Sequence, residues 1–153
     1  MKREASSPLT VVLVQPHGDT LDLYCEYLRA QKVTCVPVTN VTDAIAVAPR
    51  ADVLVTGLLL PGSEDGVELI TRLRDDRQTA RLPIVVLTAC ALESERRRAE
   101  AAGCDSFLLK PCLPSDLFKE IRRVTRAARL RRVRGAPIEA GHSDRHRRGT
   151  HRR

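Results

Sequence analysis

Short aliphatic runs alternate along the chain with segments of helical periodicity, and this alternation restricts the fold more than any other feature. The five runs are LTVVLV at 9–14, VTCVPV at 33–38, DVLVT at 52–56, LPIVVLTA at 82–89 and SFLLK at 106–110. Continuous apolar runs of this length are typical of strands that a parallel sheet buries on both faces. Pro37 cannot donate a backbone hydrogen bond, so we expect the second run to be an edge strand.

The intervening segments repeat apolar residues every three or four positions, as helices do. We predict helices over 19–31, 39–49, 66–76 and 92–103, and a last one that starts at Pro114 and ends at Gly135 and Pro137. Gly103 stands where a C-terminal cap belongs. In the last helix the apolar stripe is Leu117, Ile121, Val124 and Ala128. Alternating strands and helices predict a doubly wound α/β domain with a five-stranded parallel sheet. We place the domain at 8–131 and a basic, unfolded tail at 132–153.

Charge is distributed unevenly between these two parts. Residues 122–153 hold 12 Arg and two acids, a net charge of +10, whereas the remaining 121 residues hold 14 basic and 17 acidic groups, a net charge of −3. A basic segment of this density can neutralise phosphates on nucleic acid or on a membrane surface. The tail contains no aromatic residue, so base stacking is not expected.

Cysteine usage and hydropathy indicate a cytoplasmic protein. The five cysteines form no C-x-x-C pair, and we expect them to be reduced and buried. No apolar run approaches the roughly 18 residues that a membrane span needs. The first residues lack the pattern of a signal peptide.

Two motifs connect the chain to a known family. PIVVLTA at 83–89 ends in Thr88 and Ala89, and GCDSFLLKP at 103–111 contains Phe107, Lys110 and Pro111. In this order and spacing, together with LLLPGSEDG at 58–66, they resemble the receiver domain of bacterial response regulators, over about residues 9–130. The resemblance implies a flavodoxin-like fold of the chemotaxis-receiver type with strand order 2-1-3-4-5, and a role in two-component signalling.

The family's three acidic positions are not acidic in this chain. In receivers, two acids after the first strand hold a divalent metal and an Asp after the third strand accepts a phosphoryl group; these positions fall on Gln15, Pro16 and Gly57. Magnesium prefers oxygen ligands that include carboxylates, and glycine offers no nucleophile. We therefore expect no metal, no cofactor and no phosphorylation. Asp19 reads as an acid at a helix start, and Glu64 and Asp65 as a solvated turn.

Four residues of the family's switch are retained. Lys110 has lost its acid, and we expect its ammonium group to reach water, Asp65 or Asp19, or else to bind another anion. Thr88 is expected to bond to local backbone, and Phe107 to be a fixed core residue. The resemblance implies a peptide bond before Pro111 that is often cis.

Candidate interaction residues are mostly arginines. Arg96, Arg97 and Arg98 read as a solvated helical face, although the resemblance implies that the fourth helix, fifth strand and fifth helix meet a regulatory protein partner. The polyanion-binding candidates are Arg122, Arg123, Arg126, Arg129, Arg131, Arg132 and Arg134. His142, His146 and His151 lack cysteine neighbours and read as solvated residues.

These patterns predict a degenerate receiver that is not an enzyme and that acts through protein–protein interaction, with homodimerisation left open. One alternative is a nucleic-acid-associated regulator that binds through the basic helix end and tail. Another is a receiver that is phosphorylated on a non-standard acid.

Overall fold

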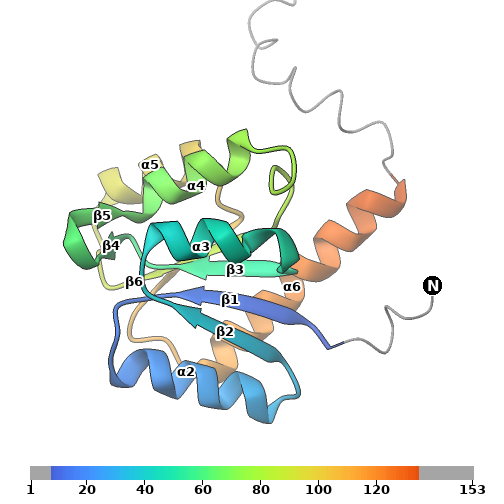
Figure 1. Ribbon diagram of the computed structural model, residues 1–153, viewed down its shortest axis with the longest axis horizontal. Coiled ribbons are helices and arrows are strands. Elements are labelled where there is room, and N and C mark those ends of the chain that lie inside the picture. The colour runs from blue at the N-terminus through green and yellow to red at the C-terminus, as the bar shows by residue number, and fades with distance from the viewer. Residues whose placement is uncertain (1–7, 135–153) are drawn as a thin grey trace, which may run out of the picture.

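A five-stranded parallel sheet forms the centre of the computed structural model, which describes residues 8–134 (Figure 1). Its strands are β1 (Thr10–Val14), β2 (Thr34–Val38), β3 (Val53–Thr56), β6 (Ile84–Thr88) and β7 (Ser106–Leu109). They lie in the order β2-β1-β3-β6-β7, which confirms the predicted order 2-1-3-4-5. Pro37 lies on the edge strand β2, also as predicted.

Helices cover both faces of this sheet, as the alternating pattern predicts. They are α2 (Asp19–Ala30), α3 (Val41–Val47), α4 (Gly66–Asp75), α5 (Glu93–Ala102) and α6 (Pro114–Arg134). A 3-10 turn, η1 (Ala48–Arg50), follows α3 and contains Pro49, where we expected the helix to end. The predicted helix end at Gly135 and Pro137 lies outside the described residues.

Strand β1 shows how the sequence creates two cores. Successive side chains of a strand point to opposite faces, so Val11 and Leu13 pack with α2 and α6 while Val12 and Val14 pack with α3, α4 and α5. All four side chains are at most 1% exposed. Each such burial contributes on the order of 1.5–3 kcal/mol, which explains why the run is continuously apolar.

A small hairpin was not predicted from the sequence. Strand β4 (Leu59–Leu60) pairs antiparallel with β5 (Glu64–Asp65) across the turn η2 (Pro61–Ser63). Two-residue strands are too short to show a periodic pattern, so the segment reads as a loop.

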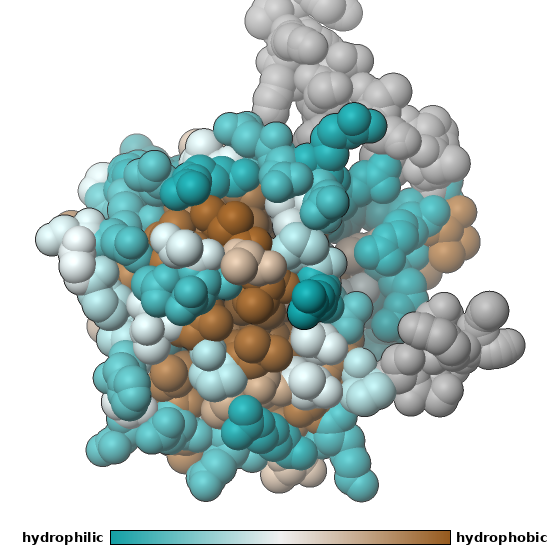
Figure 2. All heavy atoms as spheres, viewed as in Figure 1, coloured by the Kyte–Doolittle hydropathy of each residue, from teal (hydrophilic) through white to brown (hydrophobic). Residues whose placement is uncertain are grey.

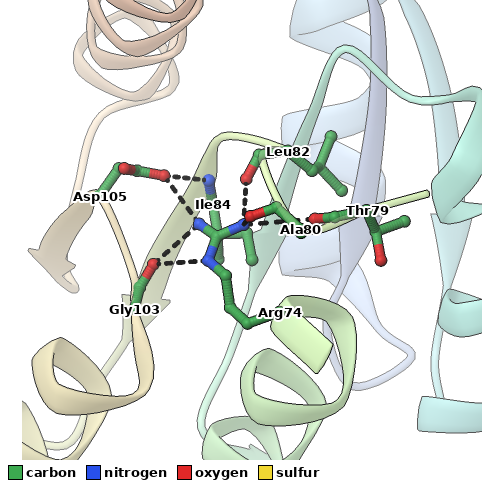
Figure 3. Close-up of polar contacts among 7 residues, drawn as sticks. All are labelled: Arg74, Thr79, Ala80, Leu82, Ile84, Gly103 and Asp105. Atoms are coloured by element: carbon green, nitrogen blue, oxygen red, sulfur yellow. Dashed lines mark hydrogen bonds and ion pairs between the residues drawn. The ribbon is translucent and has the colours of Figure 1, made fainter. Parts of the chain in front are cut away.

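Arg74 on α4 forms a largely buried polar hub that fastens two loops to this helix (Figure 3). Its guanidinium group donates hydrogen bonds to the carbonyl oxygens of Thr79, Ala80, Leu82 and Gly103 and to the Asp105 carboxylate. The side chain is only 17% exposed, and this burial lowers the pKa of Arg74. The hub therefore links the α4–β6 loop to the start of β7.

Gly103 has two functions at this hub. It ends α5 with φ 114°, in the left-handed region, which confirms the predicted cap. A Cβ atom here would also lie 2.9 Å from Nε of Arg74. The position therefore requires glycine for its backbone conformation and for the space that the guanidinium group occupies.

The last helix extends beyond the sheet (Figure 1). Its buried residues end at Ala128, and Leu130 and Val133 are 56% and 79% exposed. Figure 2 shows mostly hydrophilic side chains on this projecting end. No helix in the region 8–134 is long and apolar enough to cross a membrane.

Candidate functional site at the carboxyl ends of the strands

Three residues meet at the carboxyl ends of strands β1, β3 and β7. Gln15 directly follows β1, Gly57 follows β3 and Lys110 follows β7. The carboxyl ends of parallel strands share one edge of the sheet, which is where sites of open α/β folds lie. The Gly57 amide donates to the carbonyl oxygen of Val14 at 3.0 Å, which holds this position against the end of β1.

Gln15 is the centre of the arrangement. Its Oε1 accepts a hydrogen bond from Nζ of Lys110 at 2.8 Å, and its Nε2 donates to the carbonyl oxygen of Leu87 at 3.1 Å. The residue is only 1% exposed. A Cβ atom on Gly57 would lie 3.5 Å from Nε2 of Gln15, so the amide packs directly beside the glycine. We name Gln15, Gly57 and Lys110 the amide–lysine cluster.

Lys110 has a different partner from the two acids that we considered. Its ammonium group contacts neither Asp65 nor Asp19 but the neutral amide of Gln15. Burial lowers the pKa of Lys110, and no carboxylate in residues 8–134 forms an ion pair that would oppose this shift. The sequence identified both residues as candidates, but their pairing depends on the tertiary fold, in which all strands of the sheet are parallel and end at the same edge.

The neighbouring acids are engaged in structural bonds. Glu64 accepts a hydrogen bond from the Val41 amide at 2.8 Å, and Asp65 accepts one from the Val67 amide at 2.9 Å, as the N-cap of α4. Asp65 also forms an ion pair with Arg98 at 2.9 Å. The two acids are therefore not the solvated turn that we expected.

Asp19 and Pro16 lie at the rim of the site. Asp19 is exposed in the first turn of α2, as predicted, where an acid interacts favourably with the helix dipole. Pro16, which we expect at the second of the family's metal-acid positions, is also exposed.

Thr88, Phe107 and Pro111, the other candidate switch residues, have contacts or backbone geometry that the structure defines. The Thr88 hydroxyl accepts a hydrogen bond from the Cys90 amide at 3.1 Å, the local backbone bond that we predicted. Phe107 is half-buried, packs against the core on the α3, α4 and α5 side, and has the Arg96 guanidinium carbon 5.2 Å from its ring centroid. The Lys110–Pro111 peptide bond is cis.

The amide–lysine cluster does not fit a divalent cation. Such an ion prefers several oxygen ligands, commonly including carboxylates. Gln15 offers one neutral oxygen, and this oxygen already faces the ammonium group of Lys110. In the described part of the chain, no group of three or more His, Cys, Asp or Glu residues could hold a metal.

The arginines of α5 are exposed but paired. Arg96 bonds Glu100, Arg97 lies 3.5 Å from Glu93, and Arg98 bonds Glu95 and Asp65. The solvated face that we predicted therefore carries ordered charge pairs, and Arg98 connects α5 to the N-cap of α4.

The arginines of α6 divide into two groups. Arg122 lies over the ring of Phe118, and Arg123 bonds Glu120 at 2.6 Å. The others are exposed on the distal part of the helix; they are Arg126, Arg129, Arg131, Arg132 and Arg134. Arg132 also lines a groove of about 710 Å³ beside the α4–β6 loop, together with Arg74, Arg77 and Arg81.

Comparisons with known proteins agree with this architecture. Residues 11–122 match the sequence model of the response regulator receiver domain. The phosphate regulon transcriptional regulatory protein PhoB of Rhizobium meliloti is 41% identical over 78 residues, which are 51% of this chain and 34% of the relative. PhoB of Pseudomonas aeruginosa is 29% identical over 138 residues, covering 86% of this chain and 58% of the relative. The chain thus spans about a third and just under six-tenths of these two relatives.

A solved structure gives the same result. The receiver domain of the sensor histidine kinase PA1611 from Pseudomonas aeruginosa, with magnesium coordinated in its active-site cleft, has a TM-score of 0.71 and 25% identity. The match covers 78% of this chain and 98% of that domain. The fold is thus the flavodoxin-like receiver fold, and the chain belongs to the response regulator receiver domain family.

Proposed function

We propose that this chain is a receiver module of two-component signalling that works through protein contacts and does not accept a phosphoryl group. The amide–lysine cluster carries the proposal. Gly57 has no side chain to attack phosphorus, and Gln15 adds no negative charge that would hold a metal ion. Without a metal, the charge of a transferring phosphoryl group would be poorly compensated.

The nearby acids are poor substitutes for the missing acceptor. Glu64 and Asp65 already serve as hydrogen-bond acceptors for the Val41 and Val67 amides, and Asp65 pairs with Arg98. Phosphorylation of either residue would turn its carboxylate into a neutral acyl group and so weaken the bond to a helix N-terminal amide, which typically contributes about 1 kcal/mol. Phosphorylation on a non-standard acid is therefore the weaker alternative.

The surface formed by α5, β7 and α6 is the proposed contact with a regulatory protein. Leu92, Leu109 and Leu113 are 63%, 43% and 64% exposed, and they lie near the start of α5, at the end of β7 and just before α6. These positions share the edge of the sheet that contains the amide–lysine cluster. Contiguous exposed apolar patches mark interaction sites, and we propose that these three leucines contribute to such a patch. A second copy of this chain could occupy the same surface.

A magnesium titration tests directly whether the amide–lysine cluster binds a divalent ion. We expect the backbone amide NMR signals of Gly57 and Lys110 to stay unchanged in millimolar Mg²⁺, because the cluster offers the ion no carboxylate. The control is the variant that combines Gln15→Asp, Pro16→Asp and Gly57→Asp, which restores the three acids. Saturable shifts at Gly57 and Lys110 in the unchanged chain would contradict the proposal.

A second candidate function is polyanion binding through the distal part of α6. Its five arginines are all exposed, and four of them (Arg129, Arg131, Arg132 and Arg134) follow Ala128, the last buried residue of the helix, so they are available to a ligand. Arginine contacts to phosphate position a protein without reading the base sequence. We therefore expect binding that does not depend on DNA sequence and that falls steeply with salt, with a slope of roughly −0.9 per phosphate neutralised on duplex DNA.

Truncation of the chain tests whether polyanion binding depends on residues that the folded domain does not need. A chain that ends at Arg129 keeps every buried residue of α6 and should fold, but it should lose most of the DNA affinity. The measurement is a salt titration of duplex DNA binding by the full and truncated chains. Equal binding by the truncated chain would exclude the arginines that follow Arg129 as the source of the DNA affinity.

A further inference from the structure

Two cysteine thiols face each other across the turn between α2 and β2. Cys25 lies on α2 and Cys35 on β2, and their Sγ atoms are 2.8 Å apart. Both side chains are 4% exposed, and both are free thiols. Within residues 8–134, no other two cysteine sulfurs contact each other. We propose that this pair is a redox modification site, at which a peroxide or a small disulfide converts the two thiols into an intramolecular disulfide.

The chemistry balances with either oxidant. A peroxide accepts two electrons from the two thiols, its O–O bond breaks, the S–S bond forms and hydrogen peroxide leaves as two water molecules. A small disulfide such as oxidised glutathione first forms a mixed disulfide with one cysteine and releases one small thiol. The second cysteine then attacks, forms the Cys25–Cys35 bond and releases the other small thiol.

The short distance between the two sulfurs favours formation of the disulfide once an oxidant reaches them. The sulfurs need to approach by less than an ångström to reach a bond of about 2.05 Å. The bond would join α2 to the edge strand β2 and close only the short connection between them. Arg29 already fastens the same two elements, because its guanidinium group donates to the carbonyl oxygen of Cys35 at 3.0 Å.

Burial makes the folded pair slow to react. It raises the pKa of Cys35 and so reduces the fraction of thiolate, the form that attacks a disulfide. Oxidation therefore requires opening of the α2–β2 turn or formation of the bond during folding. An equilibrium experiment that starts from the unfolded chain avoids this kinetic barrier.

The test refolds the full chain from urea in glutathione buffers that span a range of oxidised to reduced ratios. Trypsin cleaves after Arg3, Arg29, Lys32 and Arg50, so the disulfide links the peptides 4–29 and 33–50, which mass spectrometry detects. A parallel sample stays in urea. From the entropy of closing a loop of this length, we expect the pair to oxidise about 100-fold more favourably in the folded chain than in the unfolded one. The disulfide should raise Tm by about 5–10 °C.

Matched cysteine variants show which two sulfurs form the disulfide. Cys35→Ser should abolish the linked peptide, whereas Cys90→Ser should leave its yield unchanged. A folded pair that oxidises no more readily than the unfolded one overturns the proposal. Disulfides that map instead to Cys90, Cys104 or Cys112, or that join two chains, overturn it as well.

Discussion

The bond between Gln15 and Lys110 can be measured with a double-mutant cycle. Gln15→Leu removes the amide with little change in volume, and Lys110→Met removes the ammonium group but keeps most of the stem. Each single change leaves a polar partner behind, because the amide is 1% exposed and the two groups are 2.8 Å apart. The double change removes both partners of this bond, so the amount by which it costs less than the sum of the single changes measures the interaction.

The magnitude follows from the geometry. A hydrogen bond to a charged group contributes about 1.5–3 kcal/mol when buried, but Lys110 is only partly buried and water screens it. We therefore expect a coupling free energy of about 1 kcal/mol. Gln15→Leu should cost about 2 kcal/mol, because the Leu87 carbonyl also loses a donor. Lys110→Met should cost about 1 kcal/mol, and the double variant about 2 kcal/mol.

Urea unfolding of the four proteins gives these free energies. With a slope of about 1.5 kcal/mol per molar urea, Gln15→Leu should lower the midpoint by about 1.3 M. The control cycle uses Arg97 and Glu93, whose side chains are 76% and 67% exposed and whose coupling should stay below about 0.5 kcal/mol. A coupling between Gln15 and Lys110 no larger than that of the control would refute the amide–lysine cluster as an interacting unit.

Further predictions concern Gly57 and the Arg74 hub. Gly57→Ala should stabilise the fold by up to about 1 kcal/mol in urea unfolding, because the added Cβ meets only ordinary contacts; a loss of stability would contradict the fit. Gly57→Asp alone should gain no phosphate from a small phosphodonor with Mg²⁺, since positions 15 and 16 stay non-acidic; phosphorylation of this variant would disprove the metal argument. Arg74→Ala should cost about 3–5 kcal/mol, because it removes the cation that pairs with Asp105 and the hydrogen bonds to four carbonyl oxygens. Arg72→Ala, at an exposed position of the same helix, should change stability by less than about 0.5 kcal/mol. Similar costs for the two variants, measured by urea unfolding, would show that the hub is not important for stability.

Much of the fold could be predicted from the sequence because its core is built from repeated local signals. The run at 9–14 is apolar on both faces, and the structure buries both faces of β1. Pro37 and Gly103 each act through a backbone property of one residue, which is visible without tertiary context. The hairpin at Leu59–Asp65 has no such signal, because its strands are two residues long.

The contacts of the site were less predictable. Gln15, Gly57 and Lys110 could be selected from family positions, but the bond between Gln15 and Lys110 joins residues 95 positions apart. The role of Asp65 depends on Arg98, which approaches it from another helix. Arg74 gave no sequence signal at all, because an arginine within an amphipathic helix is ordinarily an exposed residue.

Exposure of the full chain to a small phosphodonor and Mg²⁺ tests the central claim most directly. Intact-mass spectrometry measures whether the chain gains a phosphoryl group, and a receiver domain known to be phosphorylated serves as the control in the same buffer. We predict no gain in mass, because Gly57 provides no nucleophile and Gln15 and Pro16 provide no acid for a metal. Stoichiometric addition of a phosphoryl group to any Asp or Glu of the unchanged chain would contradict the account.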